Sequence, residues 1–175
     1  MRVLHALRQK SVHLPHKEGR GRASEYLGRV HIDIVGPMPV KSVGGREYVY
    51  VIVDDYTQAV YTRPFRLRSE AAEAFKTFKE AAENESGNKL REVMTDNACE
   101  LSIGREVRDT IGVLTNDSGL QDSLWAETFN TATYVHNRTP TKALDGRTSF
   151  EVRYGAKPDL AHSGHRAPSS SHWRN

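Results

Sequence analysis

Apolar runs predict four β-strands in the first half of the chain. β-branched and aromatic residues dominate each run, and turn-forming residues separate the runs, which is typical of strands. The predicted strands span residues 29–35, 48–53, 61–65 and 91–95. Short polar turns join the first three, so we expect these strands to form an antiparallel meander.

The segment between the third and fourth predicted strands has the periodicity of an amphipathic helix. Ser69 is the expected N-cap, and Gly87 can end the helix. The apolar positions that recur at helical spacing are Ala71, Ala74, Phe75, Phe78, Ala81 and Ala82. If this helix crosses over the sheet, strand 91–95 must run parallel to a neighbouring strand.

A second helix is predicted over residues 120–136, with a cap near Asp117 or Ser118. Its expected inner face consists of Leu120, Leu124, Phe129, Ala132 and Val135. We expect Trp125 to belong to the core rather than to a surface on which bases stack.

Length and composition indicate one folded domain with loose ends. A chain of 175 residues is long enough to bury a substantial core. Residues 28–158 carry the ordered patterns, whereas residues 1–27 are predicted to be a basic, loosely ordered arm. Residues 159–175 have no periodicity and are predicted to be a disordered tail.

Charge and cysteine content narrow the classes of function. The chain has 25 Lys and Arg against 22 Asp and Glu, and its net charge of +3 is compatible with nucleic-acid binding. A single cysteine, Cys99, excludes an intramolecular disulfide and a Cys-rich zinc site. His5, His13 and His16 are too few and too irregular for a closed zinc site. No apolar run has the length of a membrane span, so we expect an intracellular protein without a membrane partner.

Two aspartates are the main candidates for chemistry. Asp33 lies inside the apolar run of strand 29–35, and Asp96 directly follows strand 91–95. A carboxylate in a buried strand is costly unless a cation, an ion pair or hydrogen bonds compensate it. On neighbouring strands the two side chains would offer oxygen ligands to a divalent metal. The alternative is that each Asp only ends a strand and caps a turn.

Five sequence blocks carry a resemblance to a known family. The blocks are His31–Pro37, Tyr50–Thr57, Val93–Asn97, Leu124–Glu127 and Asn137–Thr141. In this order they resemble the integrase core of Copia-type retrotransposon polyproteins, over roughly residues 28–158. The resemblance implies an α/β fold of the ribonuclease H-like class. In this fold a mixed sheet has three antiparallel strands, a crossover helix and a further parallel strand, with flanking helices.

The resemblance also implies an activity. It assigns Asp33 and Asp96 as catalytic residues and as ligands of two Mg²⁺ or Mn²⁺ ions, which suit hard oxygen ligands. The family processes the 3′ ends of element DNA and joins them to target DNA. DNA is therefore the expected partner, with RNA as a further candidate. Intact relatives are expected to be homo-oligomers, and a functional protein is expected in the nucleus.

The chain departs from the family where the third acidic ligand is expected. In the family this ligand is a glutamate within a segment resembling Asn-Gly-x-Ala-Glu-Arg. Only twenty residues separate Asp96 from Asp117, and none of them forms such a segment. The alignment places Arg108 and Asp109 where the Glu-Arg pair belongs. We interpret this as a deletion near residues 100–117 or an error in the gene model, which makes the domain incomplete.

Other acids are weaker candidates for the missing ligand. Glu100 and Glu106 are near enough in the sequence to be tested as substitutes. Glu127 belongs to a block that follows the catalytic helix in the family, so we expect it on a helix surface.

Two classes of function remain, together with a decaying reading frame that has no selected role. The first is a retrotransposon integrase-like domain that binds nucleic acid and performs metal-dependent DNA integration, impaired because the third ligand is missing. The second is a non-catalytic ribonuclease H-like module that binds nucleic acid or partner subunits.

Overall fold

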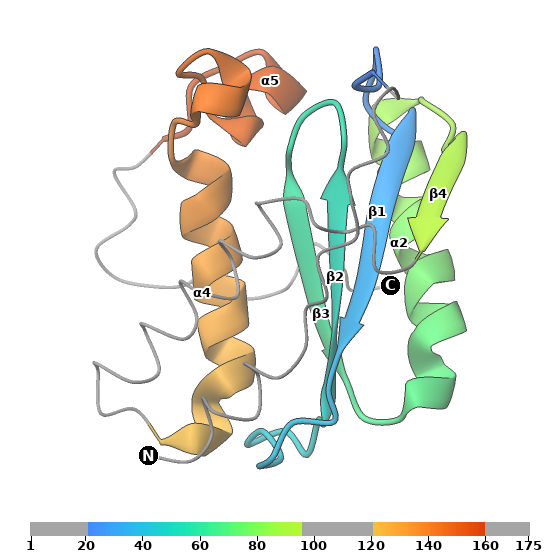
Figure 1. Cartoon of the computed structure of the whole chain (residues 1–175), viewed down its shortest axis with the longest axis vertical. Coiled ribbons are helices and arrows are strands. Elements are labelled where there is room, and N and C mark those ends of the chain that lie inside the picture. Colours follow the sequence, from blue (N-terminus) through green and yellow to red (C-terminus); the bar gives the residue numbers. More distant parts are fainter. Residues whose placement is uncertain (1–20, 96–120, 160–175) are drawn as a thin grey trace, which may run out of the picture.

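A four-stranded mixed sheet forms the centre of the molecule (Figure 1). The computed structural model describes residues 21–95 and 121–159. The strand order is β3-β2-β1-β4, and helices α2 and α4 pack on opposite faces of the sheet. This is the predicted α/β class, with three antiparallel strands and one parallel strand.

The strands match the apolar runs of the sequence closely. Their bounds are β1 Arg29–Val35, β2 Tyr48–Asp54, β3 Val60–Phe65 and β4 Glu92–Thr95. Strand β2 pairs antiparallel with both β1 and β3, which confirms the meander. Strand β2 is buried over six of its seven residues, as its continuous apolar run requires between two helical layers.

Helix α2 (Ala71–Ser86) links β3 to β4, which pairs parallel with β1 as predicted. Gly87 ends the helix with a φ of 73°, as expected for a left-handed C-cap. The N-cap prediction was wrong: Ser69 lies inside a 3₁₀ turn, η1 (Arg68–Glu70), and α2 begins after it. The Glu70 carboxylate accepts the N–H of Arg66 at 3.2 Å and so fixes the chain just before the turn.

One apolar cluster lies between α2 and the sheet. It takes alternate residues from β1 and β2 and the inner face of α2, so that only even-numbered positions of β1 take part. The buried members from strands and helix are Val30, Ile32, Tyr50, Ile52, Phe65, Ala74, Phe78 and Ala82. Tyr26 and Leu27 also belong to it, so packing begins before residue 28, earlier than the expected end of the loose arm.

Helix α4 (Trp125–Arg138) covers the other face and begins later than predicted. A 3₁₀ turn, η2 (Asp122–Leu124), precedes it, and the predicted positions Leu120, Asp117 and Ser118 lie outside the described residues. Val135 was wrongly assigned to the inner face, since it is 50% exposed. The buried residues of α4 are Trp125, Ala126, Thr128, Phe129 and Ala132. Val135 lies beyond the last of them, toward the C-terminal end of the helix.

A short helix near the end of the described chain was not predicted. Helix α5 (Ser149–Tyr154) begins with a capping box in which the side chain of Thr148 accepts the N–H of Glu151, and Glu151 accepts the N–H of Thr148. Arg153 on α5 forms an ion pair with Glu85 of α2 at 2.6 Å and lies over the Tyr26 ring at 4.3 Å. These contacts attach α5 to the α2 side of the sheet.

Candidate functional site

Asp33 lies in the middle of β1, on the face of the sheet that α4 covers. Its neighbours Ile32 and Val30 point into the cluster beneath α2, so alternation directs Asp33 to the opposite face. Asp33 is half-buried, and Val51 of β2 is its partner across the antiparallel pair. The apolar cluster on this face draws on β2, β3 and α4, and of β1 only Val35 packs against it. Asp33 therefore lies where the apolar cluster beneath α4 ends.

The sheet register brings the chain close to its second candidate acid. Thr95, the last described residue of β4, is the parallel partner of Ile32 on β1. Ile32 precedes Asp33 directly, and Thr95 precedes Asp96. The adjacent, parallel arrangement of these two strands is confirmed. Asp96 itself lies outside the described residues, so its role as the second ligand remains a prediction.

The other candidates divide between the described and the undescribed parts of the chain. Cys99, Glu100, Glu106, Arg108, Asp109 and the three N-terminal histidines lie outside the described residues. Glu127 is exposed on the first turn of α4, as predicted for a helix-surface acid. Trp125 is 6% exposed, which confirms its assignment to the core. Within residues 21–95 and 121–159, no three His, Cys, Asp or Glu side chains are grouped to hold a metal ion.

A second pair of acids, Asp54 and Asp55, lies at the end of β2, away from Asp33. Asp54 is fully buried and accepts three hydrogen bonds. Its Oδ2 accepts the N–H of Leu27 at 2.9 Å, and its Oδ1 accepts both the N–H and the hydroxyl of Thr57 at 2.7 Å. Burial raises the pKa of Asp54, while the hydrogen bonds from Thr57 and Leu27 oppose that rise. Asp54 thus joins the segment before β1 to the β2–β3 turn.

Asp55 is the centre of a charged group on the α4 side of β1. Its Oδ2 accepts the N–H of Ala23 at 2.6 Å and lies 3.3 Å from the Arg29 guanidinium. Its Oδ1 lies 3.5 Å from His31 Nε2, and Arg29 also pairs with Glu92 of β4 at 2.8 Å. Burial lowers the pKa of His31, although the nearby Asp55 carboxylate acts in the opposite direction. The group links β1, β4 and the β2–β3 turn, so its role is structural.

Two residues of the five sequence blocks, Asn137 and Trp125, form long-range hydrogen bonds to the backbone that the sequence did not predict. Asn137 of α4 makes a paired contact with Val60 at the edge of the sheet: its Oδ1 accepts the Val60 N–H at 2.8 Å, and its Nδ2 donates to the Val60 carbonyl at 2.7 Å. Trp125 Nε1 donates to the Val40 carbonyl at 2.8 Å. Both partners are more than seventy residues distant in sequence, so no local pattern could have indicated them.

The comparisons with known proteins agree with this geometry. The chain matches no family model. It is 23% identical over 162 positions to the retrovirus-related Pol polyprotein from transposon TNT 1-94 of Nicotiana tabacum. It is 21% identical over 179 positions to that from transposon RE2 of Arabidopsis thaliana. The alignments cover 75% and 86% of this chain but only 12% of each polyprotein.

A solved structure gives the fold a counterpart. The HTLV-2 integrase catalytic core domain, in complex with magnesium and in a trimeric form, is 15% identical with a TM-score of 0.53. The match covers 76% of this chain and 100% of that core. The chain is thus similar in sequence to these two Pol polyproteins and has the fold of an integrase catalytic core. We refer to it below as the integrase-like domain.

The alignment lengths agree with a shortened integrase-like domain. The alignment with the RE2 polyprotein has 179 positions, and 86% of the 175 residues of this chain, about 150, take part in it. At the remaining positions, about 29, the polyprotein has a residue and this chain has none. This difference is consistent with the short interval between Asp96 and Asp117.

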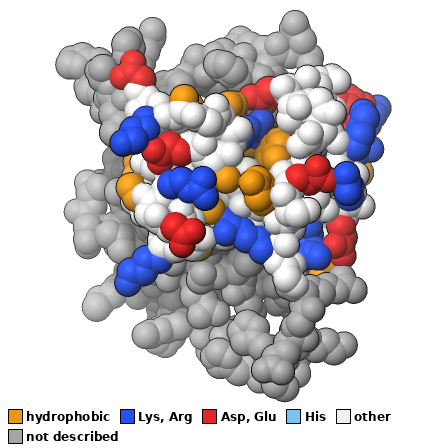
Figure 2. Space-filling model, turned by 90° about the horizontal axis from the view of Figure 1, so that it is seen from above, with side chains coloured by type: hydrophobic (Ala, Val, Ile, Leu, Met, Phe, Trp, Pro, Cys, Tyr) orange, Lys and Arg blue, Asp and Glu red, His pale blue; other side chains and the backbone are white. Residues whose placement is uncertain are grey.

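The surface of the integrase-like domain carries charges of both signs. Figure 2 views the end of the molecule at which β2 turns into β3, and there Lys and Arg side chains alternate with Asp and Glu side chains. Such a mixed surface does not by itself attract a polyanion. Among the described helices, none combines the length and the apolar character that a membrane span requires.

Proposed function

We propose that the integrase-like domain binds DNA and that its metal-dependent polynucleotidyl transfer is impaired. The observation that supports this best is the register of β1 and β4, since it pairs the residues that directly precede Asp33 and Asp96. The resemblance to integrase cores assigns these two acids to one site. We infer the activity from the Pol polyproteins, and this chain spans only a small part of their length.

The fit of a divalent metal to the described residues is incomplete. Asp33 is a half-buried carboxylate outside the apolar cluster beneath α4, and its oxygens are hard ligands of the kind that Mg²⁺ and Mn²⁺ prefer. Among the described residues, however, it belongs to no group of three possible ligands. A bound ion would stabilise charge on the attacking and leaving oxygens. We expect weak metal binding that depends on Asp96.

The relatives suggest further properties for this chain. The HTLV-2 core is described as a magnesium complex and as trimeric, and we extend both features to the integrase-like domain as proposals. A net charge of +3 is compatible with contacts to phosphates, which give affinity without sequence selectivity. We place the functional protein in the nucleus, where its DNA substrates are.

A non-catalytic binding module is the second candidate. The observation that favours it is that, among the described residues, no group of three possible metal ligands includes Asp33. The buried contacts of Asp54 and Asp55 stabilise the fold and do not involve Asp33. Such a module would bind DNA in the same way with or without Mg²⁺.

The test measures binding and joining on the same protein. Purified chain is incubated with a fluorescent duplex that carries an element-like 3′ end, in Mg²⁺, Mn²⁺ or EDTA. We expect salt-dependent binding and no joined product. A glutamate-bearing segment inserted between Val107 and Thr110 should restore some joining, and Asp33→Asn or Asp96→Asn should remove it again.

The controls separate the two candidates. Glu127→Gln changes one exposed carboxylate by the same chemistry and should affect neither binding nor the restored joining. If the inserted segment restores nothing, the non-catalytic module is the better description. If the unmodified chain joins DNA ends and Glu100→Gln or Glu106→Gln abolishes this, the chain has a substitute ligand and is not impaired.

A further inference from the structure

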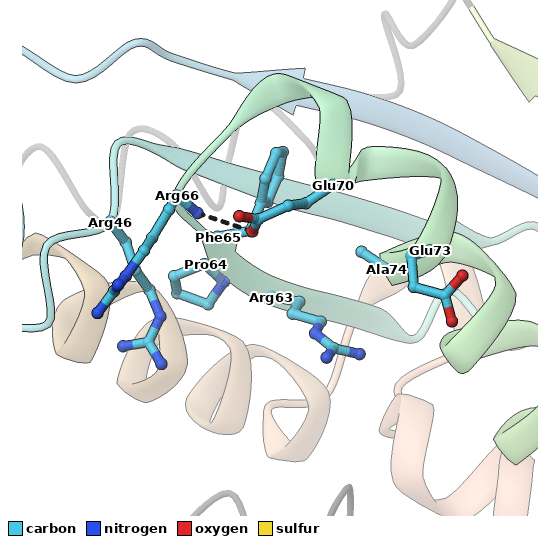
Figure 3. A pocket seen from close by; sticks show the side chains of 8 residues that line it. All are labelled: Arg46, Arg63, Pro64, Phe65, Arg66, Glu70, Glu73 and Ala74. Atoms are coloured by element: carbon cyan, nitrogen blue, oxygen red, sulfur yellow. Dashed lines mark hydrogen bonds between the residues drawn. The ribbon is translucent and has the colours of Figure 1, made fainter.

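A groove lies where β3 ends and α2 begins, outside the region of Asp33 (Figure 3). It encloses about 360 Å³, and three arginines line it: Arg46 from the loop before β2, Arg63 from β3 and Arg66 directly after β3. Figure 3 shows the Arg46 and Arg66 guanidinium groups side by side, with Arg63 on the same side of the groove. The three side chains are exposed.

The three guanidinium groups lack ion-pair partners within the part of the chain that the structure describes. No described carboxylate oxygen lies within 4.0 Å of a guanidinium nitrogen of Arg46, Arg63 or Arg66, whereas other basic side chains, such as Arg29 and Arg153, do form ion pairs. One Arg66 nitrogen makes a long hydrogen bond of 3.4 Å to the Gly44 carbonyl. Most of the donors of these arginines therefore remain directed to solvent or to a ligand.

Two glutamates also line the groove but do not neutralise it. Glu70 is held by the backbone, since its carboxylate accepts the N–H of Arg66 at 3.2 Å. Glu73 extends from the next turn of α2, at the far end of the groove from Arg46 and Arg66 (Figure 3). Three positive charges against two negative ones leave the groove with a net positive charge.

The groove and Asp33 lie on different faces and different strands of the sheet. Phe65, which lines the groove, belongs to the cluster beneath α2, whereas Asp33 points to the face that α4 covers. β3 forms one edge of the sheet and is separated from β1 by β2. A ligand in the groove would therefore leave the surroundings of Asp33 free.

We propose that the groove of Arg46, Arg63 and Arg66 binds phosphate groups of a DNA backbone. The planar guanidinium group donates paired hydrogen bonds to phosphate oxygens, and such bonds are stronger than neutral hydrogen bonds. The enclosed volume admits a phosphate with part of its sugar, but it offers no deep apolar pocket for a base. The inference deepens the proposed function, on which its choice of DNA as ligand rests, and it adds a contact surface away from Asp33.

The first experiment compares two variants with the same change in charge. One carries Arg46→Gln, Arg63→Gln and Arg66→Gln; the control carries Lys76→Gln, Lys142→Gln and Lys157→Gln, three exposed lysines outside the groove. Fluorescence anisotropy measures the affinity for a labelled duplex over a range of salt concentrations. The groove variant should bind about 10- to 100-fold more weakly, and its salt slope should fall by about 1 for each phosphate that the groove no longer binds. The affinity of the control should fall much less.

The second experiment uses the unaltered protein, so it does not depend on how a variant folds. Phenylglyoxal modifies accessible arginines, and mass spectrometry measures the rate at each site with and without the same duplex. DNA should protect Arg46, Arg63 and Arg66, while exposed Arg147 serves as the reference outside the groove.

The outcomes distinguish this inference from the proposed function. If DNA binds but protects other arginines, and the two triple variants bind alike, the groove inference is wrong and the proposed function stands. If the unaltered protein binds no DNA, both are wrong. If poly-glutamate protects the three arginines and DNA does not, the groove accepts an acidic peptide and the inference is overturned.

Discussion

Replacing Asp54 tests whether its buried hydrogen bonds hold the fold together. In Asp54→Ala, the N–H groups of Leu27 and Thr57 lose their acceptor in a place that water does not reach. A buried donor without a partner costs about 1–3 kcal/mol, so two such donors predict a loss of about 2–6 kcal/mol in the free energy of unfolding.

Asp54→Asn predicts a smaller loss by the same reasoning. The amide keeps one oxygen, which can accept from Leu27 or from Thr57 but not in both positions. One backbone donor is then left without a partner, for a loss of about 1–3 kcal/mol. The neutral amide also avoids the desolvation that raises the pKa of Asp54, which reduces the loss further.

Urea unfolding followed by circular dichroism at 222 nm measures both variants. With a slope of about 1–3 kcal/mol per molar urea, a loss of several kcal/mol shifts the midpoint by more than about 1 M. Asp122→Asn, at an exposed aspartate, is the matched control and should leave the midpoint within error. The reasoning is refuted if Asp54→Ala lowers the free energy of unfolding by less than about 1 kcal/mol, or if it is milder than Asp54→Asn.

Three further changes test other interactions. Burial lowers the pKa of His31 in the folded chain. The imidazole therefore binds a proton at a higher pH in the unfolded chain than in the folded chain, and the free energy of unfolding should fall as the pH drops below about 6.5. His31→Gln should flatten this part of the stability profile, by no more than about 1.4 kcal/mol per pH unit, and an unchanged profile would contradict the assignment. Asn137→Ala removes both partners of the Val60 backbone groups and should cost about 1–3 kcal/mol in urea unfolding, whereas Asn130→Ala, at an exposed position of the same helix, should cost little. Thr148→Ala breaks the capping box of α5 and should cost about 1 kcal/mol, and an unaltered urea midpoint would show that α5 does not contribute to the cooperative unit.

The sequence predicted the elements that have a clear apolar pattern. The strands are short runs rich in β-branched and aromatic residues, α2 follows helical spacing, and the structure confirms them with changes of one or two residues at their ends. Helix α4 was misplaced because Leu120 and Leu124 extended an apolar stripe that in fact begins with Trp125. Helix α5 was missed because six residues are too few for periodicity, although Thr148 and Glu151 have the spacing of a capping box.

The candidate site could be predicted only in part. A carboxylate within an apolar run made Asp33 a candidate, and its role as a metal ligand remains a prediction. The crossover helix predicted that β4 runs parallel to a neighbouring strand, and the structure shows that this neighbour is β1. The roles of Asp54 and Asp55 could not be read from the sequence, because their partners Leu27 and Ala23 lie 27 and 32 residues away. The local sequence indicated a turn at Asp54 and Asp55, but it did not indicate that both side chains bind the segment before β1.

The contact between Asn137 and Val60 also limits how this molecule can polymerise. Strand β3 forms one border of the sheet; there the carboxamide of Asn137 occupies the backbone groups of Val60, and Pro64 has no N–H to offer. A fibril grows by strand addition only if each subunit can accept a neighbour on both sides. Because the β3 side is closed to a further strand at these two positions, pairing through the opposite border would end with two molecules rather than continue into a filament.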